Sequence, residues 1–291
     1  MSDWPVGLST GCFYRMSIFD CLEMIRSAGF RMVEVCSSPM HLDYHDIEAV
    51  RRASQRMNEL GMEPYSFHAP FVDVDISSLD SRVREVSQRE ILVAAEAAAV
   101  FGVRHFVIHP GPDVSLTFSV EEKYQRLKNA SAVLDNVARR CQQLGVGLVL
   151  ENMLPHLPFG SPSDMMWILG EMENLNICIC LDTGHAALSG DIYNIMYKLT
   201  GHLRIIHAND NGGAGDDHLP PGKGVIDWKK VLYELGETEF HGGMILELSG
   251  ADTDPYETLE KARQASLYIR KICKEMYLSR PPSVEVPNVN E

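Results

Sequence analysis

Six short apolar segments of the chain each finish in a histidine, an aspartate or a glutamate. In chain order these residues are His68, His109, Glu151, Asp182, His207 and Glu247. Imidazole and carboxylate ligands together suit zinc, manganese, iron or cobalt better than calcium. Carboxylates packed into one cavity repel each other and lose their hydration, and a divalent cation offsets both penalties. The sequence therefore predicts a metal site if the fold brings these six ends together.

Three more candidate ligands lie in loops. His185 follows Asp182 by one helical turn in the segment DTGH, and Asp216 and His218 belong to the glycine-rich loop NDNGGAGDDHLPPGKG. A single histidine or glutamate at a strand end is more often a cap or a solvated side chain than a ligand. The prediction of a metal site therefore depends on the convergence of the whole set, which has ligands enough for one, two or three ions.

The elements that must position these residues alternate along the chain. Short apolar runs rich in β-branched residues cover 6–12, 32–37, 63–69, 105–110, 147–152, 177–182, 203–208 and 243–249. Longer segments with helical patterns separate these runs, and strands that alternate with helices form a parallel sheet. Eight such units in 291 residues predict a single α/β domain, a (β/α)8 TIM barrel. A doubly wound open sheet is the alternative, but the turn STGCFYR lacks the G-x-G-x-x-G pattern.

Local signals mark where several helices begin. Capping residues precede four of the expected helices, two of them followed by a proline at the first helical position. These residues are Ser17, Ser119 with Glu122, Ser161 before Pro162, and Asp254 before Pro255.

Strand parity predicts which side chains face the barrel interior. Cys178 and Cys180 share the face of Asp182, so we expect them to fill the interior as small apolar groups below the candidate ligand. The inward face opens at the C-terminal mouth of a barrel, where barrel active sites lie. His105 begins its strand and is expected at the opposite end. The histidines outside strand ends are expected on the surface: His41, His45, His156, His202 and His241.

The composition of the chain limits the classes of protein to which it can belong. The chain is 45% hydrophobic, without an apolar run long enough to cross a membrane, and its net charge of -14 argues against a broad nucleic-acid surface. Its seven cysteines lack the regular spacing of a disulfide framework. Without a secretory signal pattern, a reducing cytoplasm is the expected compartment. We expect the barrel over residues 1–278 and a proline-rich tail over 279–291.

The motifs around the candidate ligands resemble those of the xylose-isomerase-like barrel superfamily, which contains sugar isomerases and epimerases and also endonuclease IV. The motifs are HAP at His68, HPG at His109, EN at Glu151, DTGH at Asp182, HANDN at His207, DDHLPPGKGVIDW, and LEL at Glu247. The resemblance extends from residue 7 to about residue 270 and is specific for the superfamily, not for a substrate.

The resemblance implies a role for each matching residue. In the epimerase branch, one catalytic metal is held at the positions of Glu151, Asp182, His207 and Glu247. The two glutamates also act as acid and base there, and the histidine at the position of His185 contacts substrate. In endonuclease IV, further ligands of a three-zinc cluster match His68, His109, His185, Asp216 and His218.

We expect from these observations a divalent-metal-dependent isomerase or epimerase of a sugar or polyol, including sugar phosphates. It would act through an enediolate, with Glu151 and Glu247 as the acid and base. Lys223 and Trp228 are expected to contact the substrate. Glu34, at the end of the second strand, is expected either to contact the substrate, to orient a ligand or to brace the site. The alternatives are a zinc-dependent phosphodiester hydrolase like endonuclease IV, a keto-polyol dehydratase, and a sugar-binding barrel without activity.

Charge at the expected mouth favours a small substrate over a nucleic acid. A protein that binds a DNA backbone needs a basic track. The loops 71–80, 111–118, 153–160 and 209–224 carry one lysine and several acids. Arg15 and Lys223 are the bases expected near the mouth. The sequence leaves open whether the protein forms a homo-oligomer, because it does not distinguish an apolar helix face that packs within the barrel from one that contacts another subunit.

Overall fold

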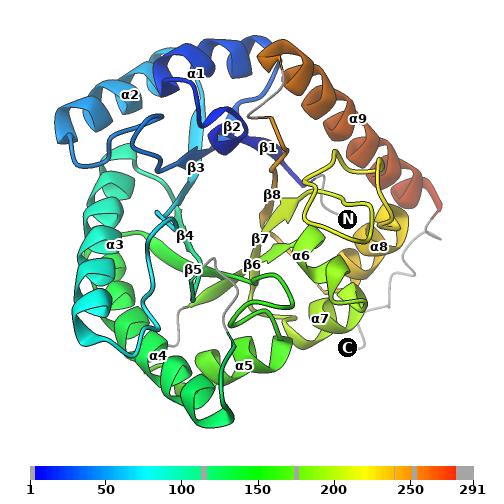
Figure 1. The fold of residues 1–291 in the computed structure, drawn as a ribbon. Coiled ribbons are helices and arrows are strands. Elements are labelled where there is room, and N and C mark those ends of the chain that lie inside the picture. The colour runs from blue at the N-terminus through cyan, green and yellow to red at the C-terminus, as the bar shows by residue number, and fades with distance from the viewer. Residues whose placement is uncertain (1–3, 113–116, 174–176, 239, 251–253, 280–291) are drawn as a thin grey trace, which may run out of the picture.

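The computed structural model describes residues 4–112, 117–173, 177–238, 240–250 and 254–279, which form a closed barrel (Figure 1). Eight parallel strands follow one another around the barrel in the order of the sequence. The last strand pairs with the first, with Val6 opposite Met244, and this pairing closes the ring. The predicted (β/α)8 barrel is therefore confirmed.

The strands are short and all run in the same direction. They are β1 (Val6–Ser9), β2 (Met32–Cys36), β3 (Glu63–His68), β4 (His105–Ile108), β5 (Gly147–Glu151), β6 (Cys178–Asp182), β7 (Leu203–Ala208) and β8 (Gly243–Leu246). Their carboxyl ends consequently meet at one end of the barrel, which we call the mouth.

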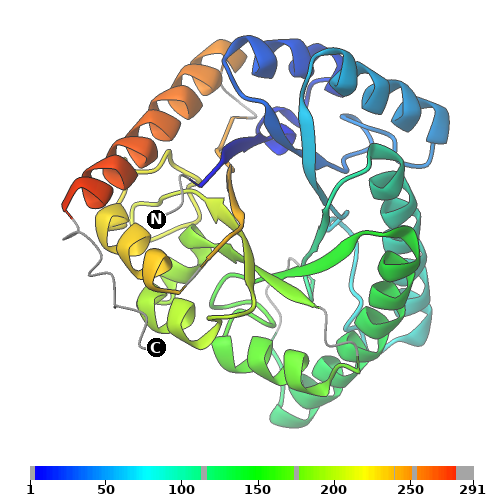
Figure 2. The same ribbon diagram turned by 180° about the vertical axis from the view of Figure 1, so that it is seen from behind.

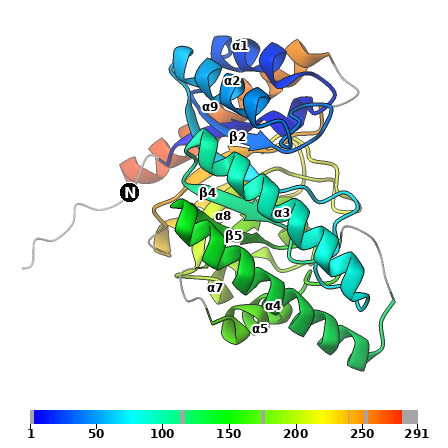
Figure 3. The same ribbon diagram turned by 90° about the vertical axis from the view of Figure 1, so that its left-hand side faces the viewer.

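Helices surround the strands on the outside, as the views from behind and from the side show (Figures 2 and 3). The helices in the described ranges are the 3-10 helix η1 (Thr10–Phe13) and the α-helices α1 (Ile18–Ser27), α2 (Ile47–Glu59), α3 (Ser81–Phe101), α4 (Val120–Leu144), α5 (Pro162–Glu171), α6 (Thr183–Leu188), α7 (Ile192–Lys198), α8 (Trp228–Glu237) and α9 (Pro255–Ser279). No helix in the described ranges is long and apolar enough to cross a membrane.

The capping residues act as the sequence predicts. The Ser119 hydroxyl accepts a hydrogen bond from the Glu122 backbone N–H, and the Glu122 carboxylate accepts one from the Ser119 backbone N–H. This reciprocal pair satisfies two N–H groups that the start of a helix leaves unpaired. The Ser17 side chain caps α1 by accepting a hydrogen bond from the backbone N–H of Phe19, and Asp254 accepts one from the backbone N–H of Tyr256.

Two apolar layers hold the barrel together. The larger layer lies between the strands and the helices, where Phe67, for example, packs against Phe101. The smaller one fills the barrel interior and consists of Met32, Tyr65, Val107, Val149, Cys180, Ile205 and Ile245. Cys178 packs against this inner layer, so the prediction for the two cysteines is confirmed. The inner layer forms the floor on which the polar residues of the mouth rest.

Several boundaries differ from the sequence prediction. The first strand ends at Ser9 because the chain turns into η1, and the last ends at Leu246. The surface prediction for His41 is wrong, because only 3% of the residue is exposed and its Nδ1 lies 2.6 Å from the Met16 carbonyl oxygen. Helix α9 continues to Ser279, and residues 280–291 of the expected tail lie outside the described residues.

Candidate metal centre

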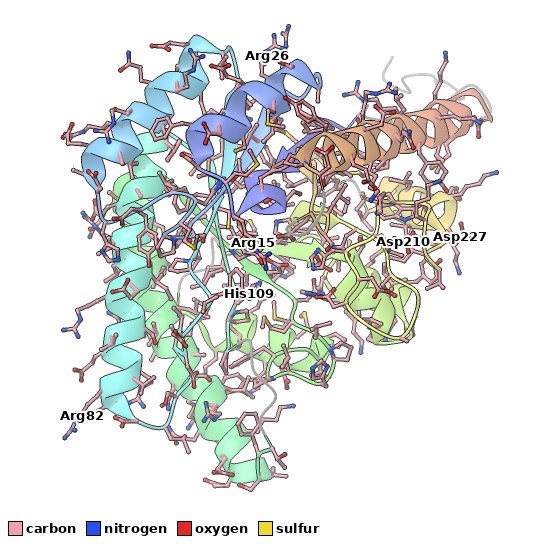
Figure 4. The ribbon with its side chains drawn as sticks, turned by 45° about the horizontal axis from the view of Figure 1, so that its top comes forward. Arg15, Arg26, Arg82, His109, Asp210 and Asp227 are labelled. Atoms are coloured by element: carbon pink, nitrogen blue, oxygen red, sulfur yellow. The ribbon has the colours of Figure 1, made fainter. Side chains whose placement is uncertain are left out.

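The barrel brings the strand-end residues together at its mouth. His68, Glu151 and Asp182 are the last residues of their strands. His207 lies one residue before the end of β7, while His109 and Glu247 directly follow β4 and β8. His109 is labelled near the middle of the barrel in Figure 4, with Arg15 close by in the same view. These small departures from the strand ends do not move any of the six away from the opening.

Four of these residues form what we call the central ligand group: Glu151, Asp182, His207 and Glu247. One ligand atom from each lies within 4.8 Å of the others. Nδ1 of His207 is 3.1 Å from Glu151 Oε1 and 3.1 Å from Glu247 Oε2. Asp182 and His207 are fully buried, whereas 22% of the Glu247 side chain is exposed. The group is therefore open to solvent on the side of Glu247.

His68, His109 and Glu151 form a second group, the lateral ligand group. Nε2 of His68 lies 3.2 Å and Nε2 of His109 lies 3.4 Å from the same oxygen, Oε2 of Glu151. The ring of Phe71, from the loop after β3, lies beside both imidazoles, with centroids 5.5 Å and 5.2 Å away. Glu151 thus belongs to both groups, and it uses a different oxygen in each.

The outer ligand group consists of His185, Asp216 and His218. Oδ2 of Asp216 lies 3.4 Å from His185 Nε2 and 3.2 Å from His218 Nε2. Asp216 and His218 come from the loop after β7, and their side chains are about a quarter exposed, at 25% and 23%. All nine predicted ligands therefore fall into three neighbouring groups at the mouth, of four, three and three residues, and Glu151 belongs to both the central and the lateral group.

Backbone carbonyls fix the orientation of three imidazoles. The Nδ1 atoms of His68, His185 and His218 lie 2.8, 2.8 and 3.0 Å from the carbonyl oxygens of Ala69, Asn152 and Glu247. A carbonyl oxygen can only accept, so each Nδ1 carries the proton and donates. Each Nε2 is then left to face a carboxylate of its group. Ligand histidines in metal sites are typically held in this way by a hydrogen bond from the other ring nitrogen.

Electrostatics at the lateral and outer groups favour a positive charge. Burial lowers the pKa of His68, but the hydrogen bond and charge of Glu151 outweigh it and raise the pKa to about 9. Burial likewise lowers the pKa of His218, but the hydrogen bond that its imidazole donates to Asp216 contributes most to raising the pKa to about 10. In both groups the carboxylates thus favour protonated imidazoles, which supply the positive charge that a metal ion would otherwise supply.

The carboxylates of the central group also have shifted pKa values. Burial raises the pKa of Glu247, but the charge of His207 reverses this and brings the pKa to about 2. Burial also raises the pKa of Asp182, and here it prevails over the neighbouring histidines. A buried set of carboxylates and correctly turned imidazoles fits a divalent metal such as zinc, manganese, iron or cobalt.

Two of the predicted substrate contacts do not fit the structure. Glu34 is fully buried below His207, and its Oε2 lies 3.0 Å from His207 Nε2. Ser66 donates to the same carboxylate at 2.8 Å. Trp228 is 1% exposed, and its Nε1–H donates to Asp210. These two residues have no surface to offer a substrate, because closure of the barrel places Glu34 under the site and the loop after β7 covers Trp228.

Lys223 lies on the exposed part of the loop after β7, and its substrate contact stays a prediction.

The sequence prediction missed two asparagines that hold Asp182. Asn152 Oδ1 accepts from the Asp182 backbone N–H at 2.8 Å, and Asn152 Nδ2 donates to the Asp182 carbonyl at 3.1 Å. Asn209 Nδ2 donates to Asp182 Oδ2 at 2.6 Å. Each asparagine lies one or two residues after a ligand, in the motifs EN and HANDN. This proximity is the signal in the sequence that could have identified them.

Comparison with known proteins was made at the level of families, sequences and structures. A family model described as xylose isomerase-like TIM barrel matches residues 22–272. The uncharacterized protein MJ1311 of Methanocaldococcus jannaschii is 28% identical over 254 residues, which are 84% of each chain. A probable endonuclease 4 of Mycobacterium leprae is 30% identical over 177 residues, 56% of this chain and 65% of that protein.

Solved structures agree with this fold. The crystal structure of a D-tagatose 3-epimerase-like protein has a TM-score of 0.82 at 23% identity and covers 94% of this chain and 98% of its own. The structure of the IOLI protein with a bound zinc atom has a TM-score of 0.73 at 19% identity and covers 93% and 97%. At these identities the likeness establishes the barrel fold alone.

Proposed function

Because the chain belongs to the xylose isomerase-like TIM barrel family, we propose that it is a divalent-metal-dependent isomerase or epimerase of a sugar or polyol, with sugar phosphates included. The observation that carries the proposal is the placement of Glu151 and Glu247. Both carboxylates reach the same atom, His207 Nδ1, at 3.1 Å, and they arrive from β5 and β8, which are not adjacent. A substrate carbon between them would meet a carboxylate on either side.

Two carboxylates in this arrangement suit proton transfer at a carbon next to a carbonyl. One carboxylate takes the proton from the substrate, and the other, which must carry a proton when the substrate is bound, returns one. Return to the same carbon from the opposite face inverts that centre, whereas return to the neighbouring carbon exchanges an aldose and a ketose. A divalent ion in the central ligand group, when bound, supplies the positive charge that stabilises the enediolate.

Other residues of the mouth would orient the substrate. His185 holds its Nδ1–H on the Asn152 carbonyl, and its Nε2, which lies 3.4 Å from Asp216 Oδ2 at the mouth, would contact a substrate hydroxyl. Phe71 is half-buried beside His68 and His109, and its exposed edge offers an apolar wall for the carbon face of a sugar. Lys223 is an exposed cation on the neighbouring loop that would suit a terminal phosphate.

The experiment that tests this function is exchange of substrate hydrogen with D2O. A panel of ketoses, ketose phosphates and cyclic polyols is incubated with the metal-loaded protein, and deuterium in the products is measured by mass spectrometry. Glu151→Gln and Glu247→Gln should each slow exchange by roughly 10²–10⁴-fold, because each removes an acid–base group. Glu171→Gln, on the exposed surface of α5, is the matched control and should exchange normally. Exchange at the unmodified rate in both site variants would exclude the mechanism.

The lateral and outer ligand groups favour a second candidate, hydrolysis of a phosphodiester. The lateral group shares Glu151 with the central group, and ligands for neighbouring ions that share one carboxylate would suit a metal-activated water attacking phosphorus. The rim of the mouth, however, offers few available cations: Lys123 pairs with Asp164 at 2.8 Å and Arg126 with Asp75 at 2.9 Å. A DNA backbone would lack its basic track. Cleavage of an abasic DNA duplex without deuterium exchange into any sugar would favour this second function.

A further inference from the structure

Asp210 is a buried carboxylate for which the proposed chemistry has no use. It lies three residues after His207 and is fully buried. Its Oδ1 accepts from the backbone N–H groups of Asn211 and Ile226 at 3.0 and 3.1 Å. Its Oδ2 accepts from the backbone N–H of Gly222 and from Trp228 Nε1, both at 3.0 Å. Both oxygens are therefore saturated by neutral donors, and the carboxylate has no ion pair among the described residues.

Three of these four donors come from the far end of the loop after β7. Asp210 thereby draws the segment 222–228 back to the end of the strand and closes the loop on itself. Backbone hydrogen bonds between Asp210 and Leu219, at 2.8 and 2.7 Å, hold the middle of the loop as well. The loop packs so closely here that a Cβ atom at Gly224 would lie 2.3 Å from Asp210 Oδ1.

The closed loop carries two of the three outer ligands. Asp216 and His218 lie between the two ends that Asp210 joins. His218 has a positive φ of 45°, a backbone conformation that is strained for a histidine and that its surroundings must maintain. The Ser249 backbone N–H donates to the His218 carbonyl at 3.0 Å, which ties the same residue to the chain after β8.

We infer that Asp210 is a positioning residue for the outer ligand group: its four hydrogen bonds set the loop so that Asp216 and His218 meet His185. This inference rests on the metal centre of the proposed function and concerns one part of it. Asp210 itself cannot be a ligand, because its oxygens are already occupied. The group it serves would hold a divalent ion next to the central one, at the side of the mouth where a substrate enters.

Asp210→Asn tests whether the hydrogen bonds of Asp210, and not only the volume of its side chain, position the loop. The amide has the size of the carboxylate but replaces one acceptor oxygen by an N–H2 group, which then faces a donor. At least one of the four hydrogen bonds is lost, and the loop relaxes. Asp227→Asn is the matched control on the same segment, since Asp227 is exposed and caps α8 through Oδ1, a role that asparagine also fills. Figure 4 labels both aspartates.

The measurement is titration of the metal-free protein with Zn²⁺ by calorimetry. Asp216→Asn removes a direct ligand, so the binding step that it abolishes identifies the outer group. Asp210→Asn should weaken that same step by about 10- to 100-fold, as loss of an outer-shell partner typically does. Binding at the central group should stay unchanged in Asp210→Asn, and Asp227→Asn should match the unmodified protein in both steps.

Three outcomes would overturn the inference. Asp210→Asn could keep the outer step at full affinity, it could weaken both steps equally, or Asp216→Asn could abolish no step. In all three cases the unmodified protein would still bind metal at the central group and exchange deuterium, so failure here is distinguishable from failure of the proposed function. If Asp210→Asn does not fold, Trp228→Phe carries the test. It removes one of the four donors and should weaken the outer step alone, and full affinity in that variant would count against the inference.

Discussion

Replacement of Glu34 by glutamine would test whether the buried carboxylate below the site sets the affinity of the central ligand group. Glu34 Oε2 lies 3.0 Å from Nε2 of His207, the ring nitrogen that points away from the other ligands. Since both side chains are fully buried, water cannot replace this hydrogen bond. Glutamine keeps the shape but loses the negative charge, and so weakens the hold on His207.

The magnitude follows from the nature of the lost interaction. A hydrogen bond to a charged partner contributes about 1.5–3 kcal/mol. Loss of such a partner from a ligand histidine lowers metal affinity by about 10- to 100-fold, which corresponds to about 1.4–2.8 kcal/mol. The two figures agree, so Glu34→Gln should raise the dissociation constant of the central ion by one to two powers of ten, roughly.

Competition with a chromophoric chelator would measure this dissociation constant, starting from metal-free protein whose circular dichroism is unchanged. Ser66→Ala is the matched control, because it removes the 2.8 Å hydrogen bond to Glu34 without touching His207. That variant should lose far less affinity than Glu34→Gln. Full affinity in Glu34→Gln, or an equal loss in Ser66→Ala, would refute the role assigned to this carboxylate.

Four other predictions concern stability and the loop. Burial and two neighbouring arginine charges lower the pKa of His105 to about 4. The contribution of His105 to stability should therefore be largest above pH 6.5 and fall by roughly 2 kcal/mol by pH 5, as the unfolded chain takes up the proton. In urea unfolding, His105→Asn should show a smaller loss. A Cβ at Gly224 would lie 2.2 Å from the Asn211 carbonyl oxygen. Gly224→Ala should therefore cost about 1–3 kcal/mol in urea unfolding, whereas Gly215→Ala on the same loop, with its nearest atom 3.7 Å away, should be neutral. Ile205→Ala should cost about 2–5 kcal/mol by the same measurement, because the side chain is fully buried in the inner layer. A chelator should lower the thermal midpoint, by the equivalent of about 2.7 kcal/mol if the ion had been present at a hundred times its dissociation constant.

The sequence was sufficient to predict the barrel and the gathering of the candidate ligands at its mouth for a physical reason. Parallel strands that alternate with helices bring all carboxyl ends to one side, so a residue such as His68 can be assigned to the mouth without knowledge of its neighbours. The same logic located Asp182 and Glu151. Their grouping follows from closure of the ring, which the order of the strands already determines.

Contacts across the barrel could not be predicted in this way. Glu34 lies in the middle of β2, and it meets His207 from a strand that is not adjacent to its own. Such a pair depends on the tilt and stagger of the closed sheet, which no local pattern records. The partners of Asp210 were missed for a related reason, because the loop after β7 has no periodicity from which its folding could be read.

Glu151 is common to the central and lateral ligand groups, one oxygen serving each. If ions bind in both groups, their affinities cannot be independent. An ion bound to one oxygen of Glu151 withdraws negative charge from the other oxygen, which the second ion requires as a ligand. Such cooperativity is reciprocal, so each ion must alter the affinity of its neighbour by the same factor. The shape of a metal titration curve would thus report the coupling that Glu151 creates between the two groups.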